Sequence, residues 1–138
     1  MFSERIINLF ANPDNVGILQ SASGVGVYTD EKTNEVFKLY LKIENNYVVN
    51  SSFKVYSGVV GIALMSAFTQ MLKNKSIENL SKLDAEDVLK EIEVNEEYEY
   101  LADDAIESLK LAVTDYQKKL EKEEETKKKA KKSKKTQE

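Results

Sequence analysis

The side chains able to do chemistry in this sequence are carboxylates, hydroxyls and lysines. The 138 residues include no cysteine, no histidine and no tryptophan. Disulfides and metal sites built from thiolate or imidazole ligands are therefore excluded. Cysteine nucleophiles and catalytic triads that need a histidine base are excluded as well. We expect no enzyme activity and no bound cofactor.

One run of carboxylates is dense enough to suggest a cation site. Carboxylate oxygens are the ligands preferred by hard cations such as Mg²⁺, Mn²⁺ and Ca²⁺. Acidic runs also form exposed faces, or add negative charge at the N-terminus of a helix, where it meets the helix dipole favourably. The residues leave both interpretations open, and the exposed face is the simpler one. The run consists of Glu93, Glu96, Glu97, Glu99, Asp103 and Asp104.

Two further patterns could bind anions. Gly58 and Gly61 precede a predicted helix, where free backbone N–H groups can receive an anion, although glycine also permits a tight turn from strand to helix. Residues 127–135 contain seven lysines, which could contact nucleic acid, an anionic membrane or an acidic protein. The lysines have no interleaved aromatic side chains for base stacking, so a solvated helix end is the simpler interpretation.

Charge divides the chain into an acidic body and a basic end. The net charge is −4, and residues 118–138 contribute ten lysines and five glutamates, which leaves −9 on residues 1–117. An acidic body disfavours nucleic-acid binding by the folded part. The sequence shows no signal peptide, and its most apolar run, residues 58–68, is too short to span a bilayer. We therefore expect a cytoplasmic protein with no membrane contact.

The elements that must position these groups begin with a short helix and a hairpin. Ser3 is a suitable N-cap for the helix, and Pro13 ends it. Residues 14–23 are rich in Asp, Asn, Gly and Ser, which indicates a loop. Strands are predicted at 24–30, 35–44 and 47–57, with one solvated face and a turn at Asn45-Asn46 between the last two.

Helices follow the strands. A helix that is apolar on nearly every side starts at Gly58, and one or two short helices lie in 76–92, where Asp84 is a likely-placed cap with Asp87 three residues later. A long helix starts near Glu97 and frays beyond Lys131. Strands grouped before helices predict an α+β fold, a three-stranded antiparallel sheet with helices on one face. We predict a domain over 1–120 and a charged helical extension over 121–138.

The chain resembles a known family in three places. The start, FSERIINLFANPDNVG, resembles the opening of the U-type iron–sulfur cluster scaffolds, which comprise IscU and the N-terminal domain of NifU. The middle, EVFKLYLKIENNYVVNSSFKVYSG, resembles their sheet hairpin, and residues 101–116 resemble the segment after their last cysteine. The resemblance covers about residues 2–120 and implies the IscU/NifU fold.

The resemblance also implies where the family's cluster ligands would lie, and none of its cysteines is present. The first cysteine falls on Thr33 and its neighbouring aspartate on Glu35, the second cysteine falls on Gly58, and the histidine–cysteine pair falls on Glu97 and Tyr98. Cluster ligation and persulfide transfer need thiolates. If the fold is kept, these positions converge, and Glu35 with Glu97 forms a weak candidate site for a hard cation. No iron–sulfur or zinc site is expected.

Three functions remain open. The resemblance implies that the N-terminal segment contacts a cysteine desulfurase, while the family's chaperone-recognition loop falls on residues 91–95 and is lost. We interpret the chain as an accessory or regulatory module of iron–sulfur assembly that carries no cluster and binds a desulfurase or a cysteine-bearing scaffold paralogue. The alternatives are a reused fold that binds a hard cation and a structural partner of an orthodox scaffold. The partner-binding residues implied by the resemblance are Phe2, Ile6, Asn12, Pro13, Asn15, Val16 and Gly17.

Overall fold

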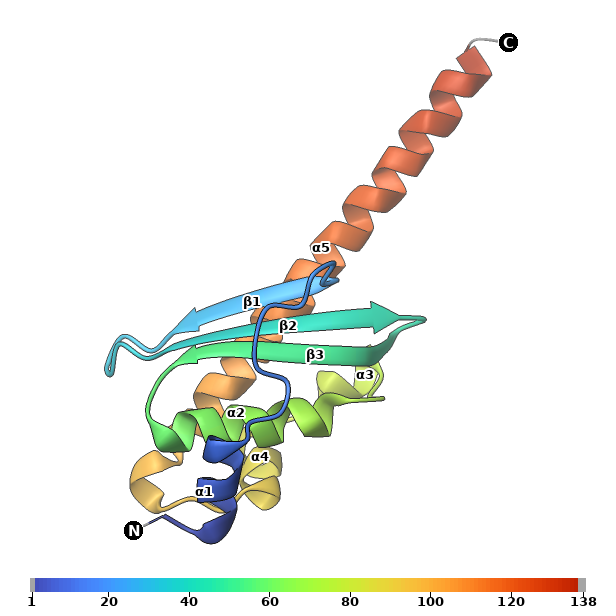
Figure 1. The fold of residues 1–138 in the computed structure, drawn as a ribbon. Coiled ribbons are helices and arrows are strands. Elements are labelled where there is room, and N and C mark those ends of the chain that lie inside the picture. Colours follow the sequence, from blue (N-terminus) through green and yellow to red (C-terminus); the bar gives the residue numbers. More distant parts are fainter. Residues whose placement is uncertain (1, 137–138) are drawn as a thin grey trace.

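The computed structural model describes residues 2–136 and confirms the α+β architecture (Figure 1). A three-stranded antiparallel sheet lies between one N-terminal helix and a series of later helices. Among the described residues no helix has the length and apolar character that crossing a membrane requires. In chain order the elements are α1 (Glu4–Ala11), β1 (Gly24–Thr29), β2 (Val36–Glu44), β3 (Tyr47–Tyr56), α2 (Val59–Leu72), α3 (Ile77–Leu80), α4 (Ala85–Glu91), the 3-10 turn η1 (Glu96–Tyr98) and α5 (Tyr100–Thr136).

The strands are arranged in the order β1-β2-β3, as the predicted meander requires. Leu39 on the central strand pairs with Gly26 on one side and with Phe53 on the other. The β2–β3 turn is made by Asn45 and Asn46, whose φ angles are 51° and 67°. Asparagine tolerates this left-handed conformation, which explains the tight two-residue connection.

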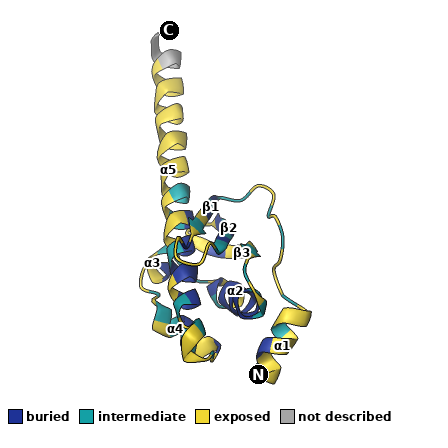
Figure 2. Cartoon of the chain, turned by 90° about the vertical axis from the view of Figure 1, so that its left-hand side faces the viewer, coloured by how far each residue is buried: buried dark blue, intermediate teal, exposed yellow. Residues whose placement is uncertain are grey.

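The hydrophobic core lies between the sheet and two helices. α5 packs on β1 and β2, and α2 packs on β3 and α1. Phe37, Leu39 and Leu41 on β2 are fully buried against them. α2 is buried on most of its circumference, as a helix apolar on nearly every side must be (Figure 2).

The opposite face of the sheet is less solvated than the strand pattern predicts. Tyr40 and Ser52 on that face are only 5% and 7% exposed. The connection between α1 and β1 crosses this face, on the side away from α5 (Figures 1 and 2). Lys42 Nζ donates to the carbonyl oxygen of Ser21 in this connection at 3.1 Å. The prediction of one solvated face is therefore wrong for the part that the connection covers.

The helix boundaries follow local capping signals. Ser3 Oγ accepts a bond from the N–H of Ile6 at 3.2 Å, and Asp84 and Asp87 form a reciprocal capping box. The last helix begins at Tyr100 and not near Glu97, because η1 turns the chain before it.

The last helix extends well beyond the sheet. α5 is buried along its first turns and leaves the body as an exposed rod (Figures 1 and 2). Leu120 is 39% exposed although it continues the apolar stripe, because the sheet no longer lies beneath it. The division of the chain at residue 120 and the fraying of its end stay predictions.

Candidate functional site

A small pocket contains three of the five positions that correspond to family ligands. Its volume is about 270 Å³. Glu35 enters from the start of β2, Gly58 from the turn between β3 and α2, and Tyr98 from η1. We call it the Glu35 pocket. It is lined by Phe2, Glu35, Ser57, Gly58, Val59, Val60, Gly61, Tyr98, Tyr100 and Leu101.

The carboxylate of Glu35 is held by two hydroxyl groups of the protein itself. Ser57 Oγ donates to Oε2, and Tyr100 Oη donates to Oε1. Burial raises the pKa of the Tyr100 phenol above its usual range, and the hydrogen bond to Glu35 raises it further. The phenol therefore remains a donor across the physiological pH range. Both oxygens of Glu35 are occupied by internal bonds, as suits a structural carboxylate.

Gly61, and not Gly58, is the glycine that the turn requires. A Cβ atom on Gly61 would lie 2.0 Å from Ser57 Oγ, whereas a Cβ on Gly58 would meet nothing within 4 Å. Gly58 has φ −84° and ψ −164°, which any residue adopts. The prediction of a glycine-dependent turn is therefore correct at Gly61 and wrong at Gly58. Gly61 lets Ser57 fold back toward Glu35.

Aromatic rings cover the mouth of the Glu35 pocket. The rings of Phe2 and Tyr98 lie 6.0 Å apart between centroids and are inclined by 58°. Tilted contacts of this kind are favourable beyond the apolar area that they bury. Tyr98 occupies the position where the family has its last cysteine, so a packed ring stands in place of a thiolate.

Thr33 and Glu97 lie outside the pocket, which corrects the expectation that all five positions converge. Thr33 is exposed in the β1–β2 turn, where its Oγ1 accepts from the N–H of Glu35 at 3.2 Å. Glu97 is exposed beside Asn95 and Glu96. Successive residues of a 3-10 turn point about 120° apart, so the inward Tyr98 directs Glu97 away.

The predicted cation site between Glu35 and Glu97 gains no support from this arrangement. Glu35 is internally bonded, and Glu97 does not line the same pocket. Within the described part of the chain, no group of three or more acidic side chains is placed to hold a metal ion. Hard cations normally take six or more oxygen ligands, which these two carboxylates do not approach.

A buried pair of aspartates beside the pocket was missed by the sequence analysis. Asp30 ends β1, Asp104 lies in the first turns of α5, and they are 9% and 4% exposed. Burial raises the pKa of Asp104 to about 7, with the neighbouring Asp30 contributing. The hydrogen bond from Asp104 lowers the pKa of Asp30. Asp104 had been grouped with the exposed acidic run, since no local signal distinguishes it from Asp103.

Asp30 organises the turn that carries Thr33. Its backbone N–H donates to the carbonyl of Glu35 at 2.9 Å, and its carbonyl accepts from the N–H of Asn34 at 2.7 Å. Its Oδ1 accepts from the N–H of Lys32 at 3.0 Å. The aspartate pair therefore connects the β1–β2 turn to the start of α5.

The N-terminal segment implied to bind a partner divides into anchoring and exposed residues. Ile6 is 4% exposed and belongs to the core. The backbone of Asn15 and Gly17 pairs with Phe53 on β3, at 2.9 Å and 2.8 Å. Both have positive φ, 64° and 122°, which suits asparagine and glycine. Val16 between them is 56% exposed. Asn12 is exposed and Pro13 is half-buried.

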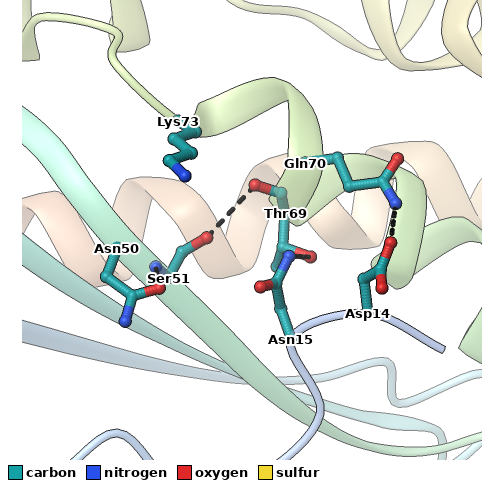
Figure 3. Close-up of a pocket in the computed structure, with 7 residues that line it drawn as sticks. All are labelled: Asp14, Asn15, Asn50, Ser51, Thr69, Gln70 and Lys73. Atoms are coloured by element: carbon teal, nitrogen blue, oxygen red, sulfur yellow. Dashed lines mark hydrogen bonds between the residues drawn. The ribbon is translucent and has the colours of Figure 1, made fainter.

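A polar cavity lies where this segment meets α2 and β3 (Figure 3). Its volume is about 340 Å³. Asn15 Nδ2 donates to Thr69 Oγ1 at 3.1 Å, Ser51 Oγ donates to the carbonyl oxygen of Thr69 at 3.2 Å, and Gln70 bonds to Asp14. These bonds fix the N-terminal segment onto α2, so the cavity is a structural junction.

Comparisons with known proteins agree with this fold. A model of the NifU-like N-terminal domain matches residues 1–123. The iron–sulfur cluster assembly scaffold protein IscU of Escherichia coli K12 is 31% identical over 127 residues, which covers 87% of this chain and 97% of that protein. The Drosophila melanogaster protein named iron–sulfur cluster assembly enzyme IscU is 33% identical over 129 residues, with 88% and 82% covered.

Solved structures are similar in fold at low identity. An iron–sulfur scaffold of the SUF system from Fervidobacterium islandicum superposes with a TM-score of 0.68 at 14% identity, covering 81% of this chain and 96% of that one. An N-terminal NifU-like protein from Brucella abortus gives 0.55 at 18% identity, covering 83% of each chain. This chain therefore belongs to the family of NifU-like N-terminal domains, which are iron–sulfur cluster assembly scaffolds.

Proposed function

We propose that this chain takes part in iron–sulfur cluster assembly as a protein-binding accessory that carries no cluster and catalyses no reaction. Its partner would be a cysteine desulfurase or a cysteine-bearing scaffold paralogue, and it would act in the cytoplasm. The proposal rests on two features: the family's fold is retained, and the family's thiolate ligands are absent.

The Glu35 pocket carries the negative half of the proposal. A cluster scaffold needs thiolates directed toward a common point. Here Glu35, the only retained acidic position, accepts two hydroxyl donors, and Tyr98 packs on Phe2. The groups that remain satisfy one another, so the site is arranged as a small piece of protein interior.

Exposed apolar side chains at the N-terminal end support the positive half. Ile7 and Phe10 lie three residues apart on α1, and they are 49% and 41% exposed. Val16 and Ile18 in the following segment are 56% and 63% exposed. Exposed apolar groups that gather on one segment suit a protein-binding surface better than a solvated one.

Co-elution with a desulfurase tests this proposal. The full chain is mixed with the cysteine desulfurase of the same organism and passed over a size-exclusion column. The expected result is a complex that Phe10→Ser weakens. Val27→Ser is the matched control, because Val27 is 51% exposed on β1 and lies outside the N-terminal segment. Failure to bind both the desulfurase and a cysteine-bearing scaffold would overturn the accessory function.

A further inference from the structure

The outward face of α5 carries a charge pattern with a definite symmetry. Its residues follow one another at intervals of three or four, so they form a single stripe along the helix. The stripe is exposed in the region where α5 leaves the body, and also opposite the sheet (Figure 2). We call this the outer stripe: Asp103, Glu107, Lys110, Thr114, Lys118, Glu121, Glu125, Lys128 and Lys132.

Residues at equal distances from the midpoint of the outer stripe have opposite charges. The midpoint lies between Gln117 and Lys118. Lys110 is seven residues before Gln117, and Glu125 is seven residues after Lys118. Glu107 and Lys128 are each ten residues away, again with opposite signs. Asp103 and Lys132 continue the pattern at fourteen.

We propose that the outer stripe of α5 is an interface on which two copies of this chain pair antiparallel about a two-fold axis near Gln117 and Lys118. A two-fold axis brings residue i of one copy opposite residue j of the other, and j opposite i, so every complementary pair occurs twice. The proposal goes beyond the proposed function and does not depend on it.

The same charges select the orientation and the register. A parallel pair would place each charge of the outer stripe opposite its own copy, which is repulsive at every layer. An antiparallel pair displaced by four residues in one direction would set Glu107 against Glu124. Displacement by four residues the other way would set Lys110 against Lys129. Only the register centred on Gln117 and Lys118 avoids like charges along the outer stripe.

Bonds within each copy prepare the groups for this network. Lys110 Nζ lies 3.5 Å from Glu107 Oε1, and the two side chains are 67% and 44% exposed. Glu125 and Lys128 have the same three-residue spacing. Pairing would therefore join two intrahelical pairs into a four-charge network, and networks contribute more than isolated surface ion pairs.

The projecting end of α5 gives a second reason for a helical partner. Residues 121–132 are all exposed and pack on no other element of the described chain (Figures 1 and 2). Helices that project into water without tertiary packing are marginal. In the proposed pair this basic end lies along the acidic first half of the second copy's α5, so each copy supports the end of the other.

Sedimentation equilibrium of the full chain tests the pairing. A dimer is expected at about 0.1 M salt, where the Debye length is about 10 Å, and its dissociation constant should rise roughly tenfold or more at about 1 M, where that length is about 3 Å. Glu107→Lys or Lys128→Glu alone should weaken the dimer by a similar factor. The double variant should restore it, because both pairs are then re-formed with reversed signs.

Matched controls separate this interface from a general effect of charge. Lys54→Glu changes the net charge as Lys128→Glu does, but Lys54 is exposed on β3, so the dimer should be unchanged. Circular dichroism establishes that each variant remains folded. A chain that is monomeric at low salt, or a double variant that fails to recover, would overturn the proposal, whether or not the lysines then bind a polyanion.

Disulfide trapping tests the orientation, because the chain has no native cysteine. Gln117→Cys should give a cross-linked dimer on mild oxidation, since the two copies of residue 117 meet at the axis. Thr126→Cys should not, because Thr126 faces residue 109 and the two copies would lie about 26 Å apart along the helices. Equal cross-linking at both positions would contradict an antiparallel pair.

Discussion

Asp30 and Asp104 form a hydrogen-bonded pair of buried carboxyl groups, in which Asp104 holds the proton and Asp30 carries the charge. Two carboxylates in contact cannot both ionise at low cost, so their pKa values separate. The pair joins the β1–β2 turn to the first turns of α5, and Glu35 and Asp103 add negative charge nearby. Protonation of Asp104 therefore contributes to the packing of α5 on the end of the sheet.

This pair predicts a decrease in stability as pH rises. The pKa of Asp104 is about 7 in the folded chain, above its usual value of 3.8. A raised folded pKa gives stability that is fully present below pH 3.8 and is lost as pH rises through about 7. The melting temperature should therefore fall between about pH 6 and pH 8.5. The lowered pKa of Asp30 acts in the opposite direction and only at acid pH, where its contribution is lost.

Asp104→Asn tests the assignment of the proton. Asparagine is neutral at every pH and keeps a donor for Asp30, so the fall in melting temperature above neutral pH should be much reduced. Asp103→Asn is the matched control, because Asp103 is exposed and its neighbour in sequence. A pH profile that Asp104→Asn leaves unchanged would contradict the shared proton.

The close approach of α5 to β1 makes Gly26 indispensable. A Cβ atom on Gly26 would lie 2.2 Å from the carbonyl oxygen of Ser108 and 2.5 Å from the nitrogen of Ala112. Both are backbone atoms, so the whole helix would have to move. Gly26→Ala should lower the free energy of unfolding by about 2–3 kcal/mol, measured by denaturant titration. Gly58→Ala meets open space and should change it by less than about 1 kcal/mol.

The Glu35 pocket predicts a difference between two tyrosines. Tyr100→Phe removes the hydroxyl that donates to Glu35 and should destabilise the fold by about 1–2 kcal/mol, since a half-buried carboxylate oxygen loses its partner. Tyr98→Phe removes the same atom from a neighbouring ring whose described contact is through its face, with Phe2. Its effect in thermal unfolding should be close to zero. Equal losses would show that the Glu35 bonds contribute nothing.

The elements of the fold were predictable because their signals are local. The alternation at Phe37, Leu39 and Leu41 predicts a half-buried strand, and the structure buries all three. Ser3 and Asp84 cap the helices as their spacing predicts. The resemblance of residues 2–120 to the U-type scaffolds is confirmed by a family match over residues 1–123.

The site was less predictable, because it depends on which side chains the tertiary structure turns inward. Asp104 follows exposed Asp103, yet helical rotation places it against Asp30. Glu97 precedes Tyr98, yet only the ring enters the pocket. Tyr40 is buried because a distant connection crosses the sheet, which strand alternation cannot reveal.

The most direct test of the central claim is to analyse the complex of this chain with its cysteine desulfurase for iron and sulfide after anaerobic cluster reconstitution. The account predicts a stable complex in which this chain adds no iron and no sulfide beyond what the desulfurase binds alone. Stoichiometric iron and sulfide on this chain would contradict it, because no thiolate is present to hold a cluster. Absence of any complex with the desulfurase or a cysteine-bearing scaffold would contradict its accessory function.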